Sequence, residues 1–212
     1  MAYKKSILAS ASEDRLEKLI AERIKPDSDK KRIDARIWDL FGEEWCVMFT
    51  DLSGFSRNVA QFGVIHFLQT IAESHRLLIP IIEDHDGILL KTEGDSFLVI
   101  FRNPPKALTA SIQMNKTLST YNQNRAPEEH VLMGVGLGFG RVLRIGDSDV
   151  FGAEVNAASK LGEDTAKAYE ILVTEAAYQA LSANANLGVS FELLAEAPTG
   201  FGKAYKVQFS LT

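Results

Sequence analysis

Two aspartates stand where a folded chain can present negative charge to a ligand. Asp51 follows the apolar run 45–50 and precedes Leu52-Ser53-Gly54-Phe55-Ser56, where a helix is predicted to begin. A carboxylate at such a strand end suits a hard cation, and the free amides of a first helical turn receive phosphate oxygens. Asp95 lies at the tip of the next predicted hairpin. Each aspartate alone also fits a structural role, as a helix cap or a turn residue.

The elements that must position these aspartates alternate in type. The patterns of apolar and turn residues predict strands at 45–50, 87–90, 96–101 and 130–145, with helices from near 56 to 84 and at 106–122. This β-α-β-β-α-β order is typical of a ferredoxin-like α+β sandwich. A helix from about 153, a strand near 170–174, a helix near 175–182 and a final pair of strands are predicted as C-terminal additions.

In such a sheet the first strand and the following hairpin are neighbours, so Asp51 and Asp95 are expected to reach one place. Two carboxylates that lie together repel each other unless a divalent cation neutralises them. The pair therefore suggests a two-metal phosphoryl site.

A helical leader precedes the sheet, and we divide the chain into a leader at 1–43 and a main domain at 44–212. Apolar residues recur at helical spacing on both sides of a break at Pro26-Asp27, which predicts two helices. The leader either packs on the main domain or acts as a dimerising or signal-transmitting element for an upstream regulator. The sequence leaves both hypotheses open.

Composition narrows the class of protein. The chain has 212 residues, of which 46% are hydrophobic and 24% charged, as in ordinary soluble globular proteins. We expect no membrane span and no signal peptide, and therefore a cytoplasmic protein, to which the single cysteine, Cys46, conforms. The net charge of −5 argues against a general nucleic-acid binder.

Three segments resemble the motifs of one family, in the family's order. Residues 49–56 and 91–95 resemble the two metal motifs of class III adenylate and guanylate cyclase catalytic domains, and residues 149–160 resemble their base-recognition and transition-state segment. The resemblance covers residues from about 45 to 175 and is looser beyond. It implies an enzyme that converts ATP to 3′,5′-cyclic AMP by attack of the 3′-hydroxyl on the α-phosphorus, with pyrophosphate leaving.

The resemblance also implies a role for each matching residue. Two Mg²⁺ or Mn²⁺ ions per site would be held by Asp51, Asp95 and the carbonyl of Leu52, and the β- and γ-phosphates by the amides of Ser53, Gly54, Phe55 and Ser56. Lys91 and Asp149 would read adenine, and Asn156 and Lys160 would orient the ribose and neutralise the phosphate in transit. Guanylate-making relatives usually carry Glu at the position of Lys91, which favours ATP. The proton acceptor is left open between Asp51, water and phosphate.

In this family the metal carboxylates of one site come from one subunit, and the adenine-reading and transition-state residues come from its partner. The chain carries both sets, so the resemblance implies a homodimer with two shared sites.

Two residues depart from the family pattern. Lys160 stands where the family usually has arginine, which keeps the charge but loses the planar, bidentate fork. Lys203 is displaced from the position of a triphosphate-binding lysine. An alternative interpretation is therefore a weakly active or inactive cyclase-homology module that binds nucleotide or a partner. A cyclase for GTP or a pyrimidine nucleotide is a further alternative.

Glycines alternate along the predicted strand 130–145, at Gly134, Gly136, Gly138 and Gly140. Side chains alternate between the two faces of a strand, so these positions share one face. We expect them to admit a closely packed backbone rather than to bind a ligand directly.

Overall fold

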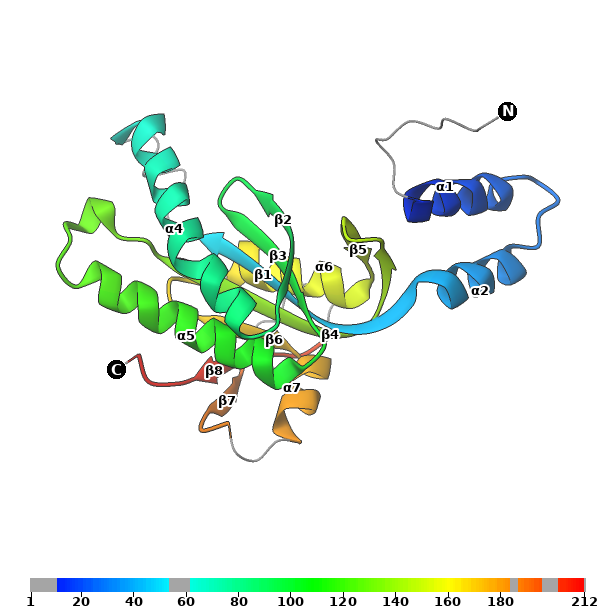
Figure 1. Cartoon of the computed structure of the whole chain (residues 1–212). Helices are drawn as coiled ribbons and strands as arrows, with labels where there is room; N and C mark the ends of the chain where they lie inside the picture. The colour runs from blue at the N-terminus through cyan, green and yellow to red at the C-terminus, as the bar shows by residue number, and fades with distance from the viewer. Residues whose placement is uncertain (1–10, 54–61, 184–186, 196–201, 212) are drawn as a thin grey trace.

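The computed structural model describes residues 11–53, 62–183, 187–195 and 202–211, and within them the strands form one sheet (Figure 1). The strand order is β2-β3-β1-β4-β6-β8-β7, and β5 pairs with β4 outside this path. The strands are β1 Gly42–Leu52, β2 Ile88–Glu93, β3 Ser96–Phe101, β4 Met133–Ile145, β5 Asp149–Phe151, β6 Ile171–Thr174, β7 Ser190–Leu193 and β8 Ala204–Gln208.

Helices precede the sheet and cover both of its faces. They are α1 Ala11–Arg23, α2 Lys30–Phe41, α4 Val64–Asp84, α5 Pro104–Asn122, α6 Ala153–Ser159 and α7 Glu175–Ser182, with a 3₁₀ turn at Pro127–Glu129 and a π-helical turn at Lys160–Thr165. The order β1-α4-β2-β3-α5-β4 with neighbours β2-β3-β1-β4 is the ferredoxin-like arrangement, so the predicted fold class is confirmed.

Alternate residues of the central strands build two separate cores. Met48 and Val99 face α4, α5 and α7, and contribute to the larger core. Val47 and Ile100 face the other way and pack with Val155 of α6. This period-two burial places α6 on the face opposite α4 and α5, so the sheet lies between two helical layers.

The glycines of β4 bring α6 close to the sheet. A Cβ atom added to Gly136 would lie 2.2 Å from the carbonyl oxygen of Ala158, and one added to Gly138 would lie 2.4 Å from that of Glu154. The Glu154 carboxylate also ties α6 to the sheet, since it accepts hydrogen bonds from the Phe139 amide at 3.1 Å and from Thr174 Oγ1 at 2.6 Å. The expectation that this glycine face admits another backbone is confirmed.

Helix α6 continues directly into the π-helical turn, which the sequence did not predict. Here the Ala166 amide donates to the Leu161 carbonyl at 2.8 Å, five residues back. Gly162 lies against β1, where an added Cβ would come within 2.6 Å of the Phe49 carbonyl oxygen. Such turns are rare and occur often at functional sites.

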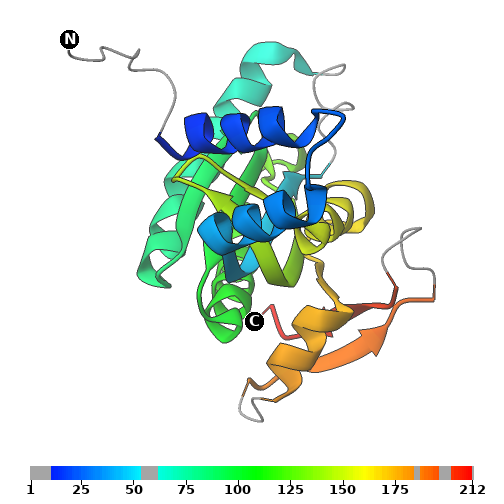
Figure 2. The ribbon, with the colours of Figure 1, turned by 90° about the vertical axis from the view of Figure 1, so that its right-hand side faces the viewer.

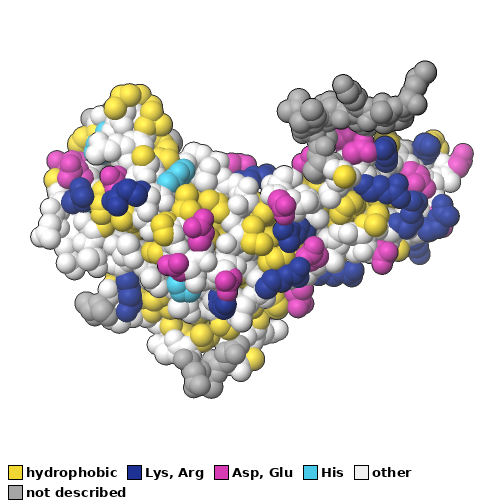
Figure 3. Space-filling model, viewed as in Figure 1, with side chains coloured by type: hydrophobic (Ala, Val, Ile, Leu, Met, Phe, Trp, Pro, Cys, Tyr) yellow, Lys and Arg dark blue, Asp and Glu magenta, His cyan; other side chains and the backbone are white. Residues whose placement is uncertain are grey.

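The leader folds as two antiparallel helices against the sheet, separated at the predicted break (Figure 2). Leu19 and Ile37 bury their side chains with Ile145 at the end of β4. Charges of both signs are interspersed over these helices (Figure 3), and some pair between them, as Arg36 does with Glu22 at 3.0 Å. Packing on the main domain is therefore observed, and the role of the leader stays a prediction.

Two local predictions differ from the structure. The prediction of a continuous helix from near residue 56 is wrong at Gly63. This residue has a φ of 87° and immediately precedes the first residue of α4. Strand β5 was not predicted, because three residues give too short a pattern and its pairing with β4 comes from the turn between them. Among the helices of the described residues, none has the length and apolar character that crossing a membrane requires.

Gly136→Ala should destabilise the protein because its new methyl group would meet backbone rather than a movable side chain. We expect the free energy of unfolding to fall by about 1–3 kcal/mol, as measured by urea denaturation. Gly152→Ala is the matched control, since its Cβ would meet no atom closer than 3.4 Å and its φ of 164° is extended backbone. Equal effects of the two substitutions would contradict the close packing described above.

Candidate active site

The two predicted metal aspartates lie close together at one end of the neighbouring strands β1 and β3. Residue Thr50 of β1 pairs with Phe97 of β3, so Asp51 lies beside the start of β3 and the hairpin tip that carries Asp95. The Thr50 hydroxyl accepts the Phe97 amide at 3.1 Å and fixes this register. Ser96 Oγ donates to Asp51 Oδ1 at 3.3 Å. The sheet therefore brings the two carboxylates together, as the strand order requires.

Both carboxyl groups are harder to ionise than usual. Burial is the largest cause that raises the pKa of Asp51 to about 6, and the Asp95 and Glu163 carboxylates add to it while the Ser96 hydroxyl and the Leu52 amide oppose it. Burial also raises the pKa of Asp95. Hydrogen bonds with its own backbone amide and with Asp51 lower this pKa, but by less than burial raises it. A pair of half-buried carboxyls that repel each other is a site that a cation would stabilise.

Lys91 and Asp149 form a second pair, 58 residues apart in sequence. Lys91 Nζ lies 2.6 Å from Asp149 Oδ2 and 3.8 Å from Glu93 Oε1. Asp149 begins β5, and its Oδ1 accepts the Val150 amide at 2.9 Å. The carboxylate is thus held by its own strand while its second oxygen meets the lysine.

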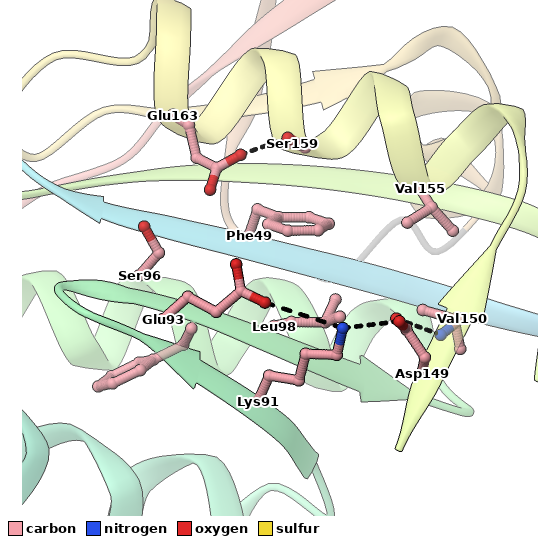
Figure 4. A pocket seen from close by; sticks show the side chains of 11 residues that line it. Phe49, Lys91, Glu93, Ser96, Leu98, Asp149, Val150, Val155, Ser159 and Glu163 are labelled. Carbon is pink, nitrogen blue, oxygen red and sulfur yellow. Dashed lines mark hydrogen bonds and ion pairs between the residues drawn. The ribbon is translucent and has the colours of Figure 1, made fainter. Parts of the chain in front are cut away.

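A pocket lies beside the Lys91–Asp149 pair and extends to Ser96, whose hydroxyl donates to Asp51 (Figure 4). One wall comes from β1, β2 and β3, and the other from β5, α6 and the π-helical turn. Its apolar lining is Phe49, Phe97, Leu98, Val150 and Val155, and its polar lining is Lys91, Glu93, Ser96, Asp149, Ser159 and Glu163. This central pocket can hold a flat apolar group between its walls, with the Lys91–Asp149 pair at one end.

Asn156 and Lys160 lie elsewhere. They share one exposed face of α6 and the π-helical turn that continues it, whereas Val155, Ser159 and Glu163 line the central pocket. Lys160 Nζ forms an ion pair with Asp164 Oδ2 at 2.9 Å, and its side chain is 53% exposed. Neither Asn156 nor Lys160 lines the central pocket in the part of the chain that the structure describes.

The predicted phosphate-binding segment is described only at its start. Gly54, Phe55 and Ser56 lie outside the described residues. The Ser53 amide donates to the Leu132 carbonyl at 2.8 Å, so a phosphate would compete with that bond. The displaced Lys203 lies 3.8 Å from Glu175 Oε1.

Glu163 is the residue that sequence reasoning missed. It accepts a hydrogen bond from Ser159 Oγ and lies close enough to Asp51 to raise its pKa. Residues 155, 159 and 163 have helical spacing, and that is the only signal in the sequence that would have placed Glu163 with the pocket-lining side chains.

The donor set at the aspartate pair suits a hard divalent cation. Two carboxylates offer oxygen ligands of the kind that Mg²⁺ and Mn²⁺ prefer, and Mg²⁺ usually takes only one or two from the protein. No group of three or more His, Cys, Asp or Glu side chains with metal-holding geometry occurs in the part of the chain that the structure describes. A backbone carbonyl, substrate phosphates and water would have to complete the coordination.

Comparison with models of known protein families shows to which family the chain belongs. A family model of the adenylate and guanylate cyclase catalytic domain matches residues 42–205. The chain belongs to this family. The match begins at the first residue of β1 and ends within β8, so it covers the sheet and follows the leader helices.

Known relatives of this cyclase domain are larger proteins. The chain is 31% identical over 130 residues to serine/threonine-protein kinase pkn2 of Myxococcus xanthus. This alignment covers 61% of this chain and 15% of that protein. It is 26% identical over 155 residues to retinal guanylyl cyclase 1 of Bos taurus, covering 66% and 14%. The chain thus spans less than a fifth of the length of these two relatives.

Solved cyclase structures share the fold. The adenylyl cyclase CyaB from P. aeruginosa superposes with a TM-score of 0.66 at 22% identity, covering 80% of this chain and 95% of that one. The guanylate cyclase domain of RhGC from Catenaria anguillulae, in complex with GTP, gives 0.65 at 21% identity, covering 78% and 96%. Adenylyl and guanylyl cyclases thus share this fold, and the base that the present cyclase domain takes depends on its own residues.

Asp51→Asn should stabilise the metal-free protein near neutral pH. Folding raises the pKa of Asp51 from 3.8 to about 6, so the stability that this carboxyl contributes is present below about pH 4 and is lost as the pH rises through about 6. Removing the charge should raise the free energy of unfolding by about 1–2 kcal/mol at pH 7.5, after discounting for partial exposure, and change it little at pH 4.

Urea denaturation in EDTA at the two pH values measures this difference. Asp39→Asn, on the exposed side of α2, is the control. It should change the free energy of unfolding by the same small amount at both pH values. An Asp51→Asn protein less stable than wild type at pH 7.5 would contradict the electrostatic description of the site.

Proposed function

We propose that the cyclase domain converts ATP to 3′,5′-cyclic AMP and pyrophosphate. The observation that carries this proposal is the Lys91–Asp149 pair, 2.6 Å apart at one end of the central pocket. Adenine offers a ring-nitrogen acceptor to the lysine and an exocyclic amine donor to the aspartate. The apolar walls at Phe49, Leu98 and Val155 suit the faces of a purine.

Asp51, Asp95 and the backbone carbonyl of Leu52 are proposed to hold two Mg²⁺ or Mn²⁺ ions. Such ions, when bound, supply Lewis-acid activation of the attacking hydroxyl and neutralise charge on the leaving phosphates. The half-buried carboxylates keep these charges in a partly desolvated place, where electrostatic interactions are stronger than in water.

The reaction itself needs positioning more than covalent chemistry. The 3′-hydroxyl of the substrate gives its proton to Asp51, water or phosphate, and its oxygen forms a bond to the α-phosphorus. The bond from that phosphorus to the bridging oxygen breaks, and pyrophosphate leaves. The amides from Ser53 to Ser56 are proposed to hold the β- and γ-phosphates. Asn156 would orient the ribose, and Lys160 would neutralise the phosphate in transit.

A homodimer with shared sites is the arrangement we propose for these roles. Asn156 and Lys160 point away from the central pocket of their own chain, on an exposed helix face. A second copy facing that surface would complete a site with its own Asp51 and Asp95, and symmetry would give two such sites.

One observation favours a second candidate, a module of low turnover that binds nucleotide. Lys160 already forms an ion pair with Asp164 at 2.9 Å, and an ammonium lacks the fork with which arginine grips a phosphate.

Product analysis of purified protein tests the proposal. The protein is incubated with ATP, GTP, CTP or UTP, each with Mg²⁺ or Mn²⁺, and the products are separated by chromatography. We expect cyclic AMP from ATP, and a loss of at least about a hundredfold in Asp51→Asn, because one metal ligand is removed. Lys116→Ala, on the far helix α5, is the control and should keep full activity.

A different cyclic nucleotide as the main product would overturn the assignment of adenine while keeping the mechanism. ATP binding without any cyclic product, under all of these conditions, would favour the binding module instead.

A further inference from the structure

A second pocket lies on the other side of the base-reading pair. It is lined by Lys91 and Asp149, which also line the central pocket, and by side chains of helix α1 and of the turn between β4 and β5. From α1 come Glu13, Leu16 and Glu17, and from the turn and its strands come Ile145, Ser148 and Phe151. The Lys91–Asp149 pair is therefore a partition between the central pocket and this leader pocket.

Helix α1 holds the turn that carries Asp149. Ser148 Oγ donates to Glu13 Oε1 at 2.8 Å and lies one residue before Asp149. Leu16 and Leu19 pack with the buried Ile145 at the other end of the same turn. A polar and an apolar contact from one helix thus fix both ends of the segment 145–149.

The rest of the turn has only local support among the contacts that the structure describes. Arg144 donates to the Gly146 carbonyl at 3.1 Å and to Asp147 Oδ1 at 2.7 Å. Asp149 itself begins β5, which is three residues long and pairs only with β4 in the described sheet. So short an edge strand is a weak anchor, and the external contact through Ser148 becomes correspondingly important.

We propose that α1 sets base recognition by holding the Asp149 turn, with Glu13 and Ser148 as positioning residues. This inference rests on the proposed function, because it assigns Asp149 to the base. The leader contacts lie at the base end of the pocket, whereas Asp51 and Asp95 lie at the β1–β3 edge. Loss of the Glu13–Ser148 contact therefore weakens binding of the base and leaves the chemistry at the phosphate unchanged.

The experiment compares Ser148→Ala, Glu13→Ala and the double variant with wild type. Nucleotide affinity is measured by titration with a non-cyclisable ATP analogue, and KM and kcat by cyclic AMP formation. Each single variant should raise the dissociation constant and KM about three- to tenfold, as expected for loss of one hydrogen bond, with kcat changed less than about twofold. Ser148→Ala also removes the 3.0 Å contact of this hydroxyl with the Ile145 carbonyl, so the double variant should be no worse than Ser148→Ala alone.

Four controls separate positioning from general damage. Ser148→Thr keeps the hydroxyl and should restore wild-type affinity. Lys18→Ala removes an exposed ion pair with Asp14 on the same helix and should change nothing. Inhibition by pyrophosphate, which has no base, should be equal in all variants, and thermal unfolding should be unchanged within about 2 °C.

The outcomes distinguish the two proposals. Unchanged affinity for the ATP analogue in Ser148→Ala and Glu13→Ala would overturn the positioning role, whatever the turnover. An equal loss of affinity for the analogue and for pyrophosphate would also overturn it. Wild type that binds the analogue but forms no cyclic nucleotide would overturn the proposed function alone, and the affinity changes would still decide the positioning role.

Discussion

The candidate site depends on the close approach of one backbone to another. Gly136 and Gly138 of β4 have no side chains. The carbonyl oxygens of Ala158 and Glu154 therefore lie only 2.2 and 2.4 Å from the points where their Cβ atoms would be. Helix α6 is thereby seated directly on the sheet, and Gly162 repeats the contact against β1. A side chain at Gly136 or Gly138 would therefore push α6, and with it one wall of the pocket, away from the sheet.

This seating divides the side chains of α6 and of the π-helical turn between two surfaces. Val155, Ser159 and Glu163 face the central pocket, whereas Asn156 and Lys160 face solvent. The residues proposed to act on one substrate are thus displayed in two directions from one chain. Helix α1 adds a further constraint, since Glu13 contacts the turn that presents Asp149. This arrangement supports the proposal that two facing copies share each site.

The sequence predicted what depends on local pattern. Strand β3 and helix α7 have their predicted bounds, 96–101 and 175–182, because a continuous apolar run and a Thr174 cap define them. The pairing of Lys91 with Asp149 and the proximity of Asp51 to Asp95 followed from strand order together with family motifs. The π-helical turn and strand β5 could not be predicted, since the turn depends on the meeting of Gly162 with β1 and the strand on its pairing with β4. Glu163 was missed for the same reason.

Mixing two inactive variants tests the shared-site account most directly. Asp51→Asn removes a metal ligand, and Asn156→Ala removes a ribose contact from the other surface; each homodimer should be inactive. In a random mixture half of the dimers are mixed, and each of these has one site free of both substitutions, so about a quarter of wild-type activity should return. Differently tagged chains establish that mixed dimers form. Mixed dimers without activity would contradict the account.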